Sequence, residues 1–205
     1  MGERVGIVGI GLMGSALSGN LLQAGFEVQG FDVDGRRVDE FAERGGVPVG
    51  SPAEAARGVR WMITSLPTSD IVREAVFGPK GIAEGAGKGL IYCDASTSRP
   101  EDSARLGAEL AERGIRFLDT AVSGTSAMAW KKDLVIIAGG KAEDFEACKP
   151  YFAAISRSAY HMGPAGSGAL TKLIINLILN GNRLVLAEGL VLGEKAGMEG
   201  KKLLN

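Results

Sequence analysis

The stretch GIVGIGLMGSALSGNLLQAG, residues 6–25, joins a short apolar run to three glycines and an amphipathic helical pattern. Gly9, Gly11 and Gly14 form a G-x-G-x-x-G motif where a predicted strand ends and a predicted helix begins. In such a motif the first glycine permits a tight turn, the second lets a pyrophosphate approach the backbone, and the third lets the helix pack closely on the strand. The motif therefore predicts a dinucleotide-binding turn.

The context of the motif strengthens this prediction, because a chain with 31 glycines can also produce an ordinary glycine turn of another α/β fold. Free amides at the helix N-terminus, where Leu12 and Met13 stand, bind an anion. The second predicted strand ends at Asp32, where a carboxylate accepts hydrogen bonds from the adenosine ribose and repels a 2′-phosphate. NAD is therefore the expected cofactor. NADP stays possible, because Arg36 and Arg37 either clamp a 2′-phosphate or are solvated turn residues.

Short apolar runs alternate with segments of helical spacing over residues 1–165. This alternation is typical of βαβ units and a parallel sheet. A capping box is predicted at Ser98 to Glu101 with Pro100 in the first helical turn, and Gly114 ends that helix. The predicted strands cover residues 4–8, 26–31, 61–66, 90–95, 116–122, 134–138 and 159–162. The sequence predicts an α/β Rossmann-type domain with a mostly parallel sheet.

The pattern changes after Gly168, because apolar positions continue almost to Gly197 without an intervening strand. This predicts one helix of nearly thirty residues, against an average of about 11 to 12. We expect a Rossmann dinucleotide-binding domain over residues 1–165. Residues 166–205 are expected to form a long interdomain helix and the start of an all-α C-terminal domain that is largely absent, so that the chain is a fragment. Because the helix is apolar on more than one face, missing C-terminal helices or a second subunit should cover it.

Composition narrows the class of partner. The 23 basic and 24 acidic residues form no long runs, so neither nucleic acid nor a membrane surface is an expected partner, whereas a small molecule is. The apolar run 168–181 is short and polar-spotted for a bilayer span. Cys93 and Cys148 lack metal-ligand spacing and indicate reduced core thiols of a cytoplasmic protein. His161 is the single histidine, which excludes a histidine-pair metal site, and it is expected to be a satisfied histidine beside Tyr160.

The run GALTKLIINLILNG carries a lysine on an otherwise apolar helix. Lys172, Asn176, Asn180 and Arg183 follow helical spacing and share one narrow stripe. Such a stripe faces a site or a water-filled crevice, or it forms a polar contact line with another helix; Lys172 can also extend its ammonium to water from an edge position. Near a helix N-terminus, the helix dipole and partial desolvation both lower the pKa of a lysine. Lys172 is therefore a candidate for proton exchange.

The glycine motif and four further segments, in this order, resemble the β-hydroxyacid dehydrogenase family. This family includes 3-hydroxyisobutyrate dehydrogenase and tartronate semialdehyde reductase, and it shares its N-terminal half with 6-phosphogluconate dehydrogenase. TSLPTSD is similar to the turn after the third Rossmann strand of the family, which implies that Leu66 and Pro67 border the cofactor. YCDASTSRP is similar to the Asp-x-Ser-Thr segment, which implies that Thr97 lies near the nicotinamide.

The other two segments concern the substrate. DTAVSGTSA resembles the substrate-carboxylate loop, which implies that Ser123 and Gly124, with Thr125 beside them, bind the substrate. GSGALTKLIIN resembles the G-x-G-x-x-x-K-x-x-x-N pattern, which implies that Lys172 is the catalytic acid/base and Asn176 orients the substrate. Without the resemblance, Ser123 and Gly124 would be an ordinary turn after a strand.

Three positions of the carboxylate loop depart from the family pattern, and so does one position before the asparagine. Thr125, Met128 and Lys132 stand where further glycines are common, and Ile175 stands where a first asparagine is common. These departures leave the substrate open.

The resemblance implies an oxidoreductase that transfers a hydride between NAD and a small 3-hydroxy acid or its semialdehyde, and that forms at least a dimer. Two other functions are compatible with parts of the pattern. One is a dinucleotide-binding protein without catalysis, against which Lys172 argues. The other is a decarboxylating sugar-phosphate dehydrogenase, which would need a basic phosphate pocket that these residues do not supply. A third reading, an α/β protein with a different ligand, would not bind a nicotinamide nucleotide.

Overall fold

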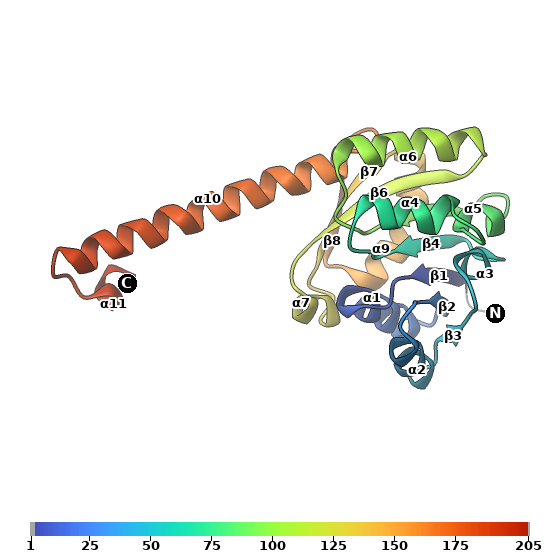
Figure 1. Ribbon diagram of the computed structural model, residues 1–205, viewed down its shortest axis with the longest axis horizontal. Coiled ribbons are helices and arrows are strands. Elements are labelled where there is room, and N and C mark those ends of the chain that lie inside the picture. The colour runs from blue at the N-terminus through green and yellow to red at the C-terminus, as the bar shows by residue number, and fades with distance from the viewer. Residues whose placement is uncertain (1–2, 205) are drawn as a thin grey trace.

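The computed structural model describes residues 3–204, so Met1, Gly2 and Asn205, which belong to the domain ranges expected from the sequence, lie outside the described residues. One eight-stranded sheet with the order β3-β2-β1-β4-β5-β6-β7-β8 forms the body of the molecule. Helices cover this body, and one long helix extends away from it (Figure 1). The predicted α/β class with a mostly parallel sheet is confirmed.

Each of the predicted strands is present, with ends shifted by at most two residues. The strands are β1 (Arg4–Val8), β2 (Glu27–Phe31), β3 (Val47–Pro48), β4 (Trp61–Thr64), β5 (Ile91–Asp94), β6 (Arg116–Ser123), β7 (Val135–Gly140) and β8 (Ser158–His161). Sequence reasoning missed β3, because two residues are too few to show an alternating pattern. β1 to β6 run parallel, whereas β7 is antiparallel to β6 and parallel to β8. The reversal is possible because antiparallel strands need no long crossover, and only one short helix separates β6 from β7.

The helices are α1 (Leu12–Gln23), α2 (Gly35–Glu43), α3 (Pro52–Ala56), α4 (Ser69–Phe77), α5 (Ile82–Gly85), α6 (Pro100–Glu112), α7 (Ser126–Trp130), α8 (Ala142–Ala147), α9 (Lys149–Ile155), α10 (Ser167–Lys195) and α11 (Gly200–Leu203). Two apolar clusters pack on the sheet. One joins the strands to α1, α7, α8 and α9 through residues such as Leu17 and Tyr151. The other joins them to α3, α4, α5 and α6 through residues such as Val72 and Leu110. A parallel sheet is normally covered on both faces in this way.

The predicted capping box before α6 is wrong. The N-cap residue of α6 is Arg99, which makes no side-chain cap, and the Ser98 hydroxyl donates to Asp94 Oδ2 at 3.1 Å instead. Ser98 therefore stands one residue before the N-cap, where its hydroxyl makes a charge-assisted hydrogen bond to the buried Asp94 carboxylate. Pro100 does begin the helix, and Gly114, with φ +73°, follows its end as predicted.

Helix α10 spans 29 residues, which confirms the predicted long helix. Its first turn packs against β6 and β7, and the rest leaves the body as the orange segment of Figure 1. Most of its large apolar side chains are exposed: Leu170, Leu173, Ile174, Leu177, Ile178, Leu179, Leu184, Val185, Leu186, Val191 and Leu192.

Among residues 3–204, α10 is the one helix whose length and composition would suit a membrane span. The expectation that residues 168–181 are too short for a bilayer span therefore does not hold for the complete helix. Buried core helices of soluble proteins pass the same test, whereas the apolar stretch of α10 is not buried.

Candidate active site

The turn between β1 and α1 has the backbone geometry that the glycine motif predicts. Gly9 adopts φ +90°, and a Cβ there would lie 2.4 Å from the Ser65 carbonyl oxygen. A Cβ on Gly14 would lie 1.9 Å from the Gly9 carbonyl oxygen, so only glycine permits this approach of helix to turn. At Gly11 a Cβ would meet nothing closer than Arg37 Nη1 at 3.6 Å. The space over Gly11 is therefore open, and no side chain caps the first turn of α1.

A cavity of about 470 Å³ lies directly over this turn. It contains seven of the residues predicted to bind the cofactor: Gly9, Gly11, Leu12, Met13, Asp32, Leu66 and Pro67. Gly14 lies behind it in α1. Sequence reasoning missed other lining residues, among them Val33 and Ile71, and it left Arg37 open between a 2′-phosphate clamp and a solvated turn residue. Val33 is 92% exposed and Ile71 44%, which is unusual for apolar side chains and places apolar surface at the mouth of the cavity. An open glycine backbone, a carboxylate and apolar walls fit a dinucleotide.

Asp32 is held firmly by its surroundings. Its Oδ2 accepts from the Ile10 amide at 2.6 Å, and its Oδ1 accepts from the Asp34 amide at 2.9 Å. Arg37 Nη1 lies 3.6 Å from Oδ2, although the Arg37 side chain is 44% exposed and that of Asp32 only 5%. Arg36, by contrast, is 75% exposed and pairs only with neighbours on α2 and its N-cap. Of the two arginines considered from the sequence, Arg37 is therefore the one that lines the cavity.

A second cavity of about 400 Å³ adjoins the first and shares Pro67 with it. It is lined by the residues that follow β4 and β5, including Thr97 and Arg99, and by Leu173 of α10. Thr97 is exposed between the buried Ser96 and Ser98. Because the carboxyl ends of β4 and β5 and one turn of α10 meet here, this cavity joins the dinucleotide cavity to the long helix.

Buried hydrogen bonds fix the loop that carries Thr97. Asp94 Oδ1 accepts from the Ser96 amide at 3.0 Å and from the Thr64 hydroxyl at 2.8 Å. The Ser96 hydroxyl in turn accepts from the Leu66 amide at 2.9 Å. The Leu66 turn and the Thr97 loop are therefore joined through the Ser96 hydroxyl.

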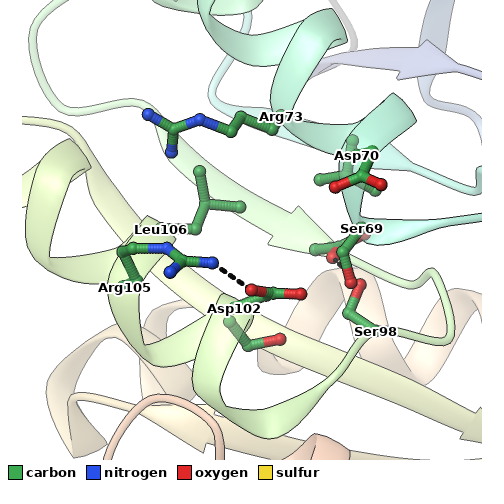
Figure 2. A pocket seen from close by; sticks show the side chains of 10 residues that line it. Ser69, Asp70, Arg73, Ser98, Asp102, Arg105 and Leu106 are labelled. Atoms are coloured by element: carbon green, nitrogen blue, oxygen red, sulfur yellow. Dashed lines mark hydrogen bonds and ion pairs between the residues drawn. The ribbon is translucent and has the colours of Figure 1, made fainter.

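A much smaller pocket lies on the other side of this loop, between α4 and α6 (Figure 2). The Asp102 carboxylate lies at its centre, paired with Arg105 and 2.6 Å from Arg99 Nε, with the Ser69 and Ser98 hydroxyls nearby. Burial raises the pKa of Asp102, but the bonds from Arg99 and Ser69 outweigh it and bring the pKa below its ordinary value. The pocket measures about 30 Å³, which is room for a water molecule rather than a substrate.

The predicted carboxylate loop follows β6. The backbone of Ser123 still pairs with Val135, and Gly124 takes φ +140°, where a Cβ would lie 2.6 Å from the Leu134 side chain. The Thr125 hydroxyl accepts from the Met128 amide at 3.3 Å and caps α7. Lys132, at a position where the family pattern has glycine, keeps a left-handed backbone with φ +56°. The loop thus retains glycine-like geometry without the glycine.

Lys172 and Asn176 are half-buried residues of α10 and line neither cavity. Burial lowers the pKa of Lys172 below its ordinary value, in the predicted direction. Leu173 places this turn of α10 at the carboxyl ends of the strands, the same edge at which the Ser123 loop lies. Asn180 and Arg183, further along the stripe, are exposed. The helix therefore carries a partly desolvated amine on the side of the sheet where the strands end and where the dinucleotide cavity lies.

His161 has a hydrogen-bond partner within the fold, as expected from the sequence. Its Nε2 lies 2.8 Å from the Gly140 carbonyl oxygen, at the end of β8. Cys93 and Cys148 are free and buried, with their sulfurs 3.8 Å apart.

Comparison with known proteins identifies this arrangement. The profile of the NAD-binding domain of 6-phosphogluconate dehydrogenase matches residues 4–163, from β1 to the residues after β8. The chain belongs to this family. A nicotinamide dinucleotide is the ligand for which the family is defined, and the cavity over the glycine turn fits one.

Relatives of the chain include dehydrogenases and reductases of small acids and aldehydes. The 3-sulfolactaldehyde reductase of Escherichia coli (strain K12) is 35% identical over 157 residues, which is 77% of this chain and 53% of that protein. Glyoxylate/succinic semialdehyde reductase 1 of Arabidopsis thaliana is 34% identical over 169 residues, which is 82% of this chain and 58% of that protein. The chain thus spans about half the length of the curated relatives it matches. The resemblance to β-hydroxyacid dehydrogenases is confirmed.

A solved structure of 3-hydroxyisobutyrate dehydrogenase from Mycobacterium tuberculosis, with L-serine, superposes with a TM-score of 0.94. It is 29% identical, and the match covers 99% of this chain and 69% of that chain. Because the match includes nearly all residues, α10 is a shared part of the family fold.

Proposed function

We propose that the protein is an NAD(H)-dependent oxidoreductase that interconverts a small 3-hydroxy acid and the corresponding semialdehyde, with Lys172 as general acid/base. One observation carries the proposal: a half-buried lysine with a lowered pKa lies on the apolar helix α10 next to Leu173, which lines the cavity that adjoins the dinucleotide cavity. Among residues 3–204 no charged partner offsets the partial desolvation of this amine, whose pKa is lowered by burial. Residues 1–165 are proposed as the dinucleotide-binding domain, and residues 166–205 as the interdomain helix and the start of a helical domain.

The proposed cofactor contacts follow from the cavity. The open backbone at Gly11 and the uncapped first turn of α1 would hold the pyrophosphate. Asp32 would accept from the ribose hydroxyls, which favours NAD over NADP, although Arg37 beside it would partly neutralise the repulsion of a 2′-phosphate. Leu66, Pro67 and Thr97 would border the nicotinamide half.

The dinucleotide, when bound, supplies the hydride-transfer chemistry. The Ser123 hydroxyl and the Gly124 amide would bind the substrate carboxylate, with Thr125 at the entrance. Lys172 in its neutral form would take the proton of the substrate hydroxyl during oxidation, and its ammonium would return the proton during reduction. Asn176, one turn further along the same face, would orient the substrate by hydrogen bonds.

The exposed apolar length of α10 supports a further part of the proposal, that the active protein is at least a dimer. Exposed apolar patches of this extent on soluble proteins mark interaction sites. Two buried free thiols support a reducing compartment, for which we propose the cytoplasm.

The test is a panel of small 3-hydroxy acids and semialdehydes, assayed by nicotinamide absorbance with NAD(H) and with NADP(H). We expect turnover of at least one member of the panel, with higher kcat/KM for NAD(H). Binding of NADH without turnover of any panel member would favour a dinucleotide-binding protein without this catalysis. No binding of either dinucleotide would overturn the proposal.

A further inference from the structure

Two buried aspartates stand side by side on neighbouring strands. Asp94 of β5 and Asp119 of β6 are direct partners in the strand register, and each is only 2% exposed. Asp94 holds the Thr97 loop through the hydrogen bonds described above. Asp119 takes no part in that network, so its cost of burial must be repaid by different partners.

These partners lie at the start of α10. Asp119 Oδ1 accepts from the Gly166 amide at 2.7 Å, and Oδ2 accepts from the Ala169 amide at 2.7 Å. Gly166, the N-cap residue, has a left-handed backbone and contributes no side-chain cap of its own. A helix N-terminus leaves four amides without intrahelical partners, and here the carboxylate from a neighbouring strand binds both ends of the first turn.

The backbone around Asp119 is packed too closely for any adjustment. A Cβ on Gly168 would lie 2.7 Å from Asp119 Oδ2 and 2.4 Å from the Ile137 carbonyl oxygen. A Cβ on Gly139, the partner of Asp119 on β7, would lie 2.5 Å from Oδ1. The two glycines therefore allow the carboxylate, the first turn of α10 and β7 to occupy adjoining space.

This contact sets the register between the helix and the strand. Lys172 lies about 4.5 Å beyond Ala169 along the helix axis, and Asn176 about 10.5 Å beyond it. Ser123 lies about 13 Å beyond Asp119 along β6. Because Leu173 reaches the carboxyl ends of β4 and β5, the helix runs toward the same sheet edge as β6. With Ala169 bonded to Asp119, the Cα of Lys172 lies about 8 Å short of the level of Ser123, so the reach of its side chain toward the loop depends on the height at which Asp119 holds the first turn of α10.

We infer that Asp119 is a positioning residue of the proposed reaction, which locks the first turn of α10 to β6 and thereby fixes the reach of Lys172 to the substrate loop. The inference rests on the proposed function. Only an ionised carboxylate satisfies both amides, because each of its oxygens accepts and neither donates. Burial raises the pKa of Asp119, and the hydrogen bonds from the Gly166 and Ala169 amides oppose this rise.

The experiment compares Asp119→Asn with a matched control in the active protein. The asparagine keeps the volume but directs an NH₂ group toward one of the two amides, which loosens the first turn. Asp144→Asn is the control, since Asp144 is an equally buried aspartate of α8 that pairs with Arg116 at the start of β6 and, within residues 3–204, makes no hydrogen bond to α10. Lys172→Met serves as the reference for loss of the proton-transfer group. Measurements are kcat, KM, dinucleotide Kd, melting temperature and amide exchange of residues 166–172.

For Asp119→Asn we expect kcat to fall about 10- to 100-fold well below its melting temperature, since a displacement of about 1 Å has an effect of this size. The dinucleotide Kd should stay within about twofold, and residues 166–172 should exchange faster. Asp144→Asn should lower the melting temperature without changing kcat. If Asp119→Asn does not fold, Gly168→Ala carries the test, because its added methyl displaces the helix while Asp119 remains.

Two results would overturn the inference: a kcat of Asp119→Asn within twofold of the parent, or equal losses of kcat in the Asp119 and Asp144 variants. Unchanged amide exchange over residues 166–172 would by itself overturn the claim that Asp119 holds the first turn of α10. Full turnover in Lys172→Met would instead overturn the proposed function, and with it the role assigned to Asp119.

Discussion

The sheet body and helix α10 differ in how much of their apolar surface they bury within the chain. The body closes two cores, one on each face of the sheet, from residues within its own sequence. Helix α10 is at least as apolar in composition, yet Leu177, Val185 and Leu192 are each 70% exposed or more. The dinucleotide cavity therefore lies in a part of the chain with its own apolar cores, whereas Lys172 lies on a helix whose large apolar side chains are mostly exposed.

The strongest test of this separation is Lys172→Met. We expect turnover to fall about 10²- to 10⁴-fold, the usual contribution of a general acid/base. Dinucleotide affinity should be nearly unchanged, because Lys172 lies outside the dinucleotide cavity. The fold should tolerate the change, since methionine keeps most of the volume and removes a partly desolvated ammonium.

The measurement is turnover, dinucleotide affinity and melting temperature of the variant beside the parent. Turnover within a few-fold of the parent would refute the assignment of Lys172. A large change in dinucleotide affinity would contradict the separation between the body and α10, because it would show that Lys172 contributes to the dinucleotide site.

The next largest expected effect is the change of turnover with pH. During oxidation Lys172 must be neutral to accept a proton, so the rate should fall about tenfold for each pH unit below its pKa. Because burial lowers the pKa of Lys172, the midpoint should lie below the ordinary value of 10.5. A pH–rate profile in the direction of oxidation checks this. A midpoint at or above the ordinary lysine value would contradict it, and Lys172→Met should lose this limb of the profile.

Asp32→Ser tests the body alone. Removing a carboxylate that binds the ribose diol should weaken NAD(H) binding roughly 10- to 100-fold, the range for hydrogen bonds to a charged group. The gap between NAD(H) and NADP(H) should narrow, while kcat at saturating cofactor changes little.

Asp34→Ser is the matched control for Asp32→Ser. Asp34 caps α2 by accepting from the Arg36 amide at 3.1 Å, and serine can replace it in that role. Equal or tighter binding of NADP(H) by the parent protein would argue against the assignment of Asp32.

The smallest expected effect on stability comes from the exposed face of α10. Replacing Leu177, Val185 and Leu192 together by Gln should reduce self-association in sedimentation experiments. The unfolding free energy of the body should change by no more than about 0.5 kcal/mol per site, as for other surface substitutions. Val47→Gln, at the exposed edge strand β3, is the control and should leave association unchanged. A well-dispersed monomer of the parent at high concentration would contradict the prediction.

Local sequence patterns were sufficient to predict most secondary-structure elements, but not all of the contacts between them. The strands other than β3, the long helix and the glycine turn were predictable because each leaves a periodic or steric signature in a few consecutive residues. The capping box failed because the helix begins at Pro100, which makes Arg99 the N-cap and leaves Ser98 one residue too early. Val33 and Ile71 were missed as cavity residues because their role depends on which strands become neighbours, and the sequence left the role of Arg37 open.

The sequence by itself determined the fold class, the dinucleotide turn and the unusual position of Lys172, because these follow from spacing, chirality and the chemistry of single side chains. Only the tertiary structure decided that β7 runs against β6, that Arg37 rather than Arg36 lies beside Asp32, and that Asp119 binds the first turn of α10. Asp119 and Gly166 are separated by 47 residues of chain. Their contact exists because the sheet brings β6 and β7 together, and no window of local sequence records which backbone amides a buried carboxylate will meet.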